Sequence, residues 1–106
     1  MKLLTEELRK ELPKLYSQEE NNDPFVYIKF FFPAGNYTWF VTEGEEEDGD
    51  FMFFGYVVGH AEEWGYFTLK QLEEIEVHGL KIERDLYFKQ GNFKEVLAQF
   101  KKERGA

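Results

Sequence analysis

The chain contains 106 residues, of which 42 % are hydrophobic and 19 % are aromatic, enough for the core of one domain spanning residues 1–106. It has no cysteine, which excludes disulfides, thiolate metal sites and cysteine nucleophiles. The formal net charge of −8 disfavours nonspecific binding to phosphate backbones and anionic lipids.

Residues 1–15 alternate charged and apolar side chains, unlike a secretory signal, and no stretch approaches the roughly 20 apolar residues of a membrane span. We therefore expect a cytoplasmic protein. Leu4, Leu8 and Leu12 lie on one face of a helix that Thr5 is placed to cap. Pro13 limits this helix, which should end near Glu11.

Two aromatic and β-branched stretches, residues 25–32 and 37–42, predict strands joined as a hairpin. An acidic loop over residues 43–50 follows, with Gly44 and Gly49 as turn residues. Residues 51–58 and 64–67 predict a third strand and a short fourth strand.

Thr68 and Gln71 have the spacing of a capping box at the start of a second helix. Residues 80–88 predict a fifth strand. Asn92 and Glu95 repeat the capping-box spacing before a last helix. The predicted fold is α+β, with a largely antiparallel five-stranded sheet, about three helices and the order α-β-β-β-β-α-β-α.

The region from Phe30 to Leu69 contains no Lys or Arg and supplies the whole excess negative charge, because acids and bases balance in the rest of the chain. The acidic residues of the predicted loop are either a solvated hairpin that keeps an aromatic sheet soluble or a site for a ligand or partner. If the strands form a meander, the acidic turns at residues 43–50 and 62–63 are candidates to lie at the same end of the sheet. The residues proposed for binding are Glu43, Glu45, Glu46, Glu47, Asp48, Asp50, Glu63, Trp64, Arg84 and Asp85.

Arg84 alternates with Ile82 and Leu86 on the fifth strand, and a buried guanidinium needs an acidic partner. Glu43, Glu63 and Asp85 are the possible partners in a structural ion pair. The functional alternative is an anion clamp at a sheet edge.

Five motifs resemble a bacterial family classed only as a domain of unknown function. They are Trp39–Gly44, the Asp48–Asp50 turn, Phe53–Val57, Glu63–Phe67 and Ile82–Phe88. The resemblance extends over nearly the whole chain. Members of that family are typically encoded on plasmids and integrative elements, which implies an accessory role and carries no catalytic residue over to this sequence.

An enzymatic alternative is a metal-dependent nuclease in which several carboxylates converge on an ion. Its candidate ligands are His60, Glu62, Glu63, Glu83 and Asp85. Against it, none of the lysines has an acidic residue two positions before it, as the common nuclease pattern requires. The two histidines lack a third His or Cys, and there is no nucleophile elbow or phosphate loop.

Trp39, Tyr56, Trp64 and Tyr66 have the flat rings needed to stack nucleobases, but such stacking normally accompanies a basic groove, and this region is acidic. The interpretation that remains is an accessory or regulatory protein of a mobile element. It would bind another macromolecule, namely a protein, through an acidic aromatic surface, and a basic DNA-binding protein is one candidate. No cofactor or metal is expected, and a small-ligand pocket between helices and sheet is a third reading.

Overall fold

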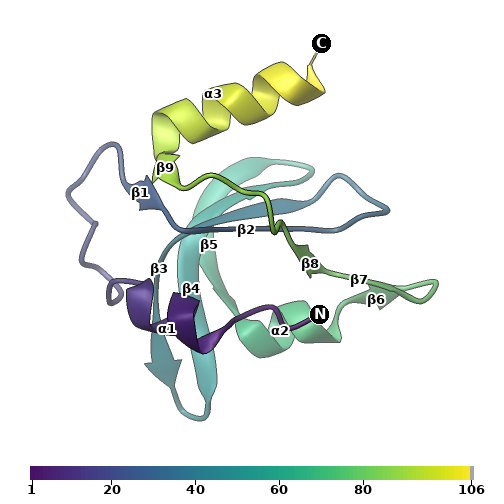
Figure 1. Cartoon of the computed structure of the whole chain (residues 1–106), viewed down its shortest axis with the longest axis horizontal. Coiled ribbons are helices and arrows are strands. Elements are labelled where there is room, and N and C mark those ends of the chain that lie inside the picture. The colour runs from purple at the N-terminus through teal and green to yellow at the C-terminus, as the bar shows by residue number, and fades with distance from the viewer. Residues whose placement is uncertain (106) are drawn as a thin grey trace.

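Four strands that follow one another along the chain form an antiparallel meander at the centre of the molecule. The computed structural model describes residues 1–105. The five-stranded sheet has the order β5-β4-β3-β2-β8 (Figure 1). Its strands are β2 (Ile28–Phe31), β3 (Thr38–Glu47), β4 (Asp50–Val58), β5 (Glu62–Thr68) and β8 (Glu83–Arg84).

Three helices and two short ladders complete the architecture. The helices are α1 (Glu6–Glu11), α2 (Leu69–Glu74) and α3 (Phe93–Arg104). One ladder pairs β1 (Phe25–Val26) with β9 (Gly91–Asn92), and the other pairs β6 (Glu76–Val77) with β7 (Leu80–Lys81). The predicted α+β class, five-stranded antiparallel sheet and element order are confirmed. Within residues 1–105, no helix has the length and apolar character needed to span a bilayer.

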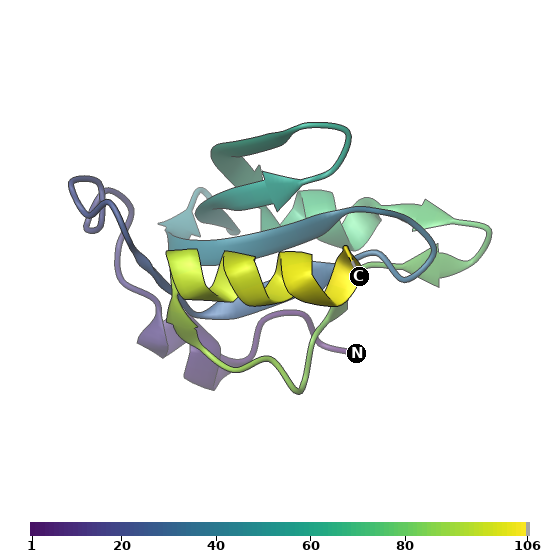
Figure 2. The same cartoon turned by 90° about the horizontal axis from the view of Figure 1, so that it is seen from above.

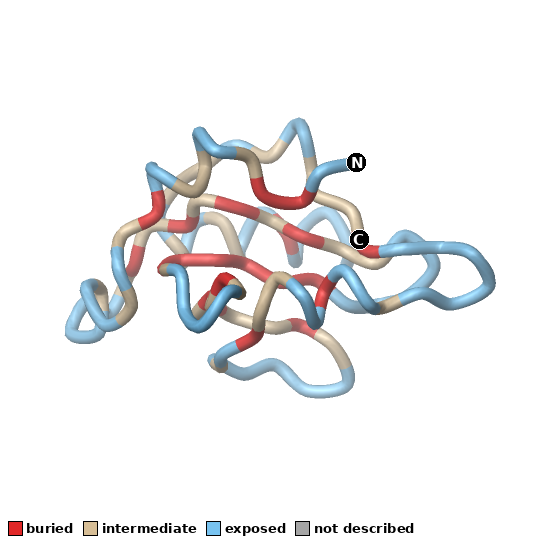
Figure 3. The backbone as a smooth tube through the Cα atoms, turned by 90° about the horizontal axis from the view of Figure 1, so that it is seen from below, coloured by how far each residue is buried: buried red, intermediate tan, exposed pale blue. Residues whose placement is uncertain are grey.

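Separate hydrophobic clusters cover the two faces of the sheet. Leu12 and Leu72 pack with Phe30 and Phe53 in the larger cluster, with α1 and α2 on that side. Phe100 of α3 packs with Val26, Phe40 and Val58 in the smaller one. Figures 1 and 2 show α3 on one side of the strands, and Figure 3 shows the buried backbone concentrated in the strands and the N-terminal segment.

Two predicted strands are interrupted. The stretch 25–32 divides at Tyr27, so Val26 joins the α3 cluster while Ile28 and Phe30 face the opposite cluster. The stretch 80–88 divides into β7 and β8, and Leu86, placed beside Arg84 by strand alternation, is 61 % exposed. Period-two patterning predicted each stretch as strand but contained no signal for the changes of direction.

The predicted acidic loop is mostly strand. β3 continues to Glu47, and only Asp48 and Gly49 form the turn, with φ of 51° and 80°. An Asp-Gly pair at positive φ matches the twist of a tight hairpin. Glu47 pairs with Asp50 at one end of β4, whereas Val58 pairs with Glu62 at the other. The two acidic turns therefore lie at opposite ends of the sheet, contrary to the expectation that they share one.

Helix ends follow the predicted caps in two of three cases. The Thr5 hydroxyl accepts from the Leu8 amide at 3.1 Å, and Thr68 with Gln71 forms a complete capping box. For α3 the prediction is wrong, because the Asn92 side chain makes no capping hydrogen bond within the described residues. Asp23 instead accepts from the Lys94 amide at 2.8 Å.

We expect Asp23→Ala to lower the free energy of unfolding by about 1 kcal/mol, because it removes the acceptor for an orphan amide at the start of α3. Urea denaturation measures the change. Asn92→Ala is the matched control and should have a much smaller effect, since no capping bond is lost. A larger loss for Asn92→Ala than for Asp23→Ala would contradict this assignment.

Candidate functional site

A buried carboxylate organises one side of the candidate site. Glu43 of β3 is 3 % exposed, and its Oε1 and Oε2 accept from the backbone amides of Tyr16 and Gln18 at 2.8 and 2.7 Å. The prediction of Glu43 as part of a solvated loop is therefore wrong. A carboxylate is a strong acceptor for backbone amides, and its bonds hold the loop after α1 against the sheet.

The place of this contact follows from the strand lengths. β2 pairs with β3 only as far as Val41, so the rest of β3 has a free edge on that side. Residues 13–18 cover this edge. The Gly44 amide donates to the Pro13 carbonyl at 3.0 Å, and Glu45 Oε1 accepts from the Leu15 amide at 2.9 Å.

Gln18 ties the same loop to two strands. Its side-chain amide nitrogen donates to the carbonyls of Phe25 and Thr42 at 3.1 and 2.9 Å. Its side-chain oxygen accepts from the Phe25 amide at 2.8 Å. A side chain with both donors and an acceptor can satisfy several backbone groups at once. Gln18 therefore anchors both ends of the segment formed by residues 19–24.

Aromatic side chains form the other side of the site. Phe54 and Tyr56 of β4 lie opposite Tyr66 and Trp64 of β5 in the strand register. Alternation places all four on the sheet face that α3 shares. The rings of Phe54 and Trp64 stack with centroids 5.6 Å apart and an interplanar angle of 11°.

Helix α3 covers only one end of this aromatic row. Phe93, at its start, contacts the rings of Tyr56 and Trp64 with centroids 4.9 and 4.6 Å away. The helix has 12 residues and is about 18 Å long, whereas a strand of nine residues such as β4 spans about 30 Å. Beyond the helix, Trp64 remains 39 % and Tyr66 50 % exposed.

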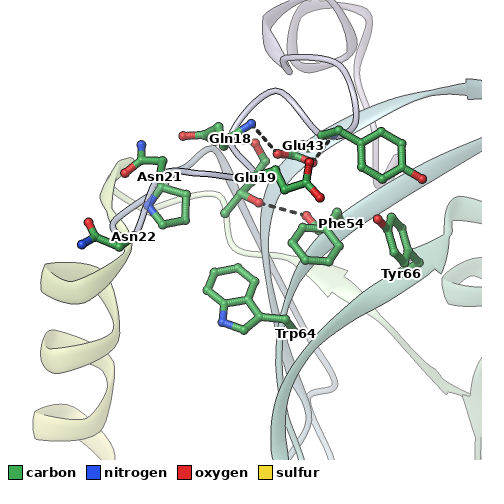
Figure 4. Close-up of a pocket in the computed structure, with 11 residues that line it drawn as sticks. Gln18, Glu19, Asn21, Asn22, Glu43, Phe54, Trp64 and Tyr66 are labelled. Carbon is green, nitrogen blue, oxygen red and sulfur yellow. Dashed lines mark hydrogen bonds between the residues drawn. The ribbon is translucent and has the colours of Figure 1, made fainter.

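The loop and the aromatic row enclose an open groove of about 380 Å³. In Figure 4, Gln18, Glu19, Asn21 and Asn22 lie on the loop side, and Phe54, Trp64 and Tyr66 lie on the sheet side. None of the lining side chains is basic. The lining consists of Tyr16, Gln18, Glu19, Asn21, Asn22, Pro24, Thr42, Glu43, Phe54, Trp64 and Tyr66.

The acidity of the groove affects Tyr66. A hydrogen bond with the Tyr16 side chain raises the pKa of Tyr66 to about 12, together with desolvation and the charges of Glu43 and Glu19. The Tyr16 and Tyr66 ring centroids are 6.2 Å apart. The Tyr66 hydroxyl is therefore held in its protonated form beside Tyr16.

Most of the predicted binding residues lie away from the groove. Only Glu43 and Trp64 line it, and Glu45 holds the adjoining loop. Glu46 pairs with Arg9 at 2.6 Å. Glu47 and Asp48 lie at the exposed end of the β3–β4 hairpin, Glu63 lies on the outermost strand β5, and Asp50 accepts from the Lys70 amide at the start of α2 at 3.2 Å.

Arg84 does not pair with any of the acids predicted for it. Its Nη2 donates to the Lys2 carbonyl at 3.1 Å, and no ion pair links it to Glu43, Glu63 or Asp85 within residues 1–105. Asp85 instead pairs with Lys29 at 3.4 Å. Arg84 pairs with Phe30 in the strand register, so its guanidinium lies on the sheet face that Leu3 and Leu4 cover, where it reaches the Lys2 carbonyl.

The nuclease candidates are divided between the two sheet edges. Glu62 and Glu63 lie on β5, with His60 in the turn before it, whereas Glu83 and Asp85 lie on or beside β8. β5 and β8 are the outermost strands of the sheet. Across the described residues, no group of three or more His, Asp or Glu side chains is arranged to hold a metal ion.

Sequence reasoning missed much of the groove. The alternating aromatics of residues 54–56 and 64–66 indicated a shared face, and Trp64 and Tyr66 were considered for stacking. Trp39, considered with them, is only 7 % exposed and lies in the core. No local signal marked Tyr16, Gln18 or Glu19, because their position depends on Glu43, more than twenty residues away.

Comparison with known proteins identifies the family. The family model described as "Protein of unknown function (DUF2958)" matches residues 3–105. The chain belongs to this family. Searches of curated proteins and of solved structures gave no match. For this DUF2958 member, the groove geometry is therefore the basis on which a function is argued.

We expect Glu43→Gln to lower the free energy of unfolding by about 2 kcal/mol, because a neutral amide offers one acceptor oxygen where the carboxylate serves two backbone amides. Urea denaturation and amide exchange at Tyr16 and Gln18 measure the loss. Glu47→Gln, in the exposed part of the same strand, should leave both unchanged. Equal effects of the two variants would refute the anchoring role of Glu43.

A second prediction concerns ionisation. The raised pKa of Tyr66 favours the protonated folded state, so its contribution to stability is present below pH 10 and is lost as the pH rises toward about 12. Tyr16→Phe removes the principal cause, and the pKa of Tyr66 should fall toward its ordinary value. Carbon-13 NMR titration of labelled tyrosines measures it. Tyr37→Phe, outside the groove, is the control and should not change Tyr66.

Proposed function

We propose that this DUF2958 member is an accessory or regulatory protein of a mobile element that binds another protein in the cytoplasm. The binding surface is the groove between residues 16–24 and the aromatic side chains of β4 and β5. The mobile-element context rests on the family resemblance carried by the sequence motifs. Binding through this surface is supported by the partly exposed aromatic side chains of Trp64 and Tyr66.

Exposed aromatic side chains are the strongest physical support. Trp and Tyr are enriched at protein interfaces because each buries a large area at a small cost in side-chain entropy. Here two of them lie beside each other on β5, next to a groove of about 380 Å³. A rigid strand holds them in place, so little ordering is needed when a partner binds.

Charge supports a protein partner over nucleic acid. All the excess negative charge lies between Phe30 and Leu69, and the groove lining has no Lys or Arg. Such a surface repels phosphates, whereas single-stranded nucleic acid is normally bound where aromatic side chains accompany a basic groove. A partner with a basic surface would be attracted and would associate faster at low salt.

Affinity capture with a tagged protein from cells of the source organism tests this function. Purified candidate partners are then titrated against wild type and the double variant Trp64→Ala, Tyr66→Ala. We expect the double variant to weaken binding by at least about tenfold, since Trp and Tyr are enriched among the interface residues whose truncation costs more than about 1 kcal/mol. Tyr87→Ala is the control, because Tyr87 is 94 % exposed and lies outside the groove.

Two results would contradict the proposal. One is that partners bind the double variant as tightly as wild type while both proteins are folded. The other is that the protein cleaves single- or double-stranded DNA with Mg²⁺ or Mn²⁺ and Asp85→Asn abolishes the cleavage, which would favour the nuclease alternative.

A further inference from the structure

Some carboxylates that reach another element of the fold pair with a base, whereas others accept from amides. Glu46 pairs with Arg9, Glu62 with Lys101 and Asp85 with Lys29, at 2.6, 2.9 and 3.4 Å. The cation lowers the pKa of Glu62, as does the hydroxyl of Tyr56, which donates to the same carboxylate at 3.0 Å. These acids contribute to cohesion between elements of the fold.

The two carboxylates of the groove differ from these. Among residues 1–105, neither Glu19 nor Glu43 forms an ion pair with Lys, Arg or His. Glu43 accepts two backbone amides, which leaves its negative charge in place, and Glu19 is exposed at the loop side of the groove. Both charges contribute to the raised pKa of Tyr66, so the field they produce reaches the aromatic side.

Uncompensated carboxylates beside aromatic rings are the chemistry of a cation site. Rings attract a cation over their faces, and the attraction strengthens when carboxylates add their charge. In this groove, Trp64 and Tyr66 provide partly exposed rings, and Gln18, Asn21 and Asn22 provide neutral polar groups. The absence of a basic lining residue leaves the cation to be supplied by a ligand.

We propose that the groove binds an arginine side chain presented by a basic segment of the partner protein. The guanidinium lies against the ring of Trp64 or Tyr66 and donates to the carboxylate of Glu19. This inference rests on the proposed function and specifies the chemistry of its partner. A second copy of this chain is a poorer occupant, because two molecules with a net charge of −8 repel each other.

Arginine fits these features better than lysine. Its planar guanidinium stacks on aromatic faces, is less strongly hydrated than an ammonium group and carries five donors in a fixed arrangement. A carboxylate beside flat rings accepts such donors while the plane of the cation remains in contact with a ring. A compact, strongly hydrated ammonium group gains less from an open groove of this kind.

The two tryptophans allow a direct test. In protein labelled with 5-fluorotryptophan, Trp64 reports on the groove and Trp39, which is 7 % exposed, serves as an internal reference. The probes are three peptides of the form acetyl-Gly-X-Gly-X-Gly-amide, in which X is arginine, its neutral isostere citrulline, or lysine. We expect the arginine peptide to shift the fluorine resonance of Trp64, to leave that of Trp39 in place, and to bind more weakly as salt increases.

Matched variants separate local charge from total charge. Glu19→Gln and Glu47→Gln change the net charge equally, but only Glu19 lines the groove. Glu19→Gln should weaken binding of the arginine peptide about threefold to fivefold, the range expected for a partly exposed charge contact, and Glu47→Gln should have little effect. Trp64→Ala removes the reporter, so the loss of binding in that variant is measured by calorimetry.

Equal affinity for the arginine and citrulline peptides would overturn the inference, and so would equal affinity for arginine and lysine. A Trp64 resonance that shifts with protein concentration in the absence of peptide would indicate a second copy as the occupant and would also overturn it. If the identified partner requires Trp64 and Tyr66 while no peptide binds, the protein-binding function stands and the arginine site falls. If the partner binds the double variant normally, the proposed function itself fails.

Discussion

The carboxylate of Glu43 is the contact on which the arrangement of the candidate site depends. By accepting from the amides of Tyr16 and Gln18, it fixes the loop after α1 against the unpaired half of β3. That loop then leads to Asp23, which caps the start of α3. One buried charge thus determines the position of the loop that forms one side of the groove. Through Asp23 it also helps to position the start of α3. Its desolvation is offset by strong hydrogen bonds rather than by a cation.

The groove is also a consequence of how a short helix covers a long sheet. α3 packs through Phe93 on Tyr56 and Trp64 and through Phe100 on Phe40. The end of the aromatic row beyond the helix has no helical cover. The opposite face is filled by the cluster around Phe30 and Phe53, which leaves the α3 side as the place where aromatic side chains remain available.

The acidic residues serve three distinct purposes in this fold. Some pair with bases and join elements, as Glu62 does with Lys101 of α3. Glu43 and Glu45 act as acceptors for the backbone of the loop. Glu19 and Glu43 maintain a negative field over the exposed rings of the groove. Net charge alone does not distinguish these purposes, because the distinction depends on which carboxylates meet a cation.

The sequence by itself determined the local structure: the Thr5 cap, the Thr68 capping box, the antiparallel meander and the α+β class, because these depend on residues close together in the chain. It did not determine that Glu43 is buried, that Asp23 caps α3, or that Arg84 reaches the Lys2 carbonyl. Those contacts join residues from twenty-five to more than eighty positions apart, and periodicity has no information at that range. An acidic segment on an aromatic sheet was evident in the sequence, but only tertiary packing decided which of its charges remain uncompensated beside exposed rings.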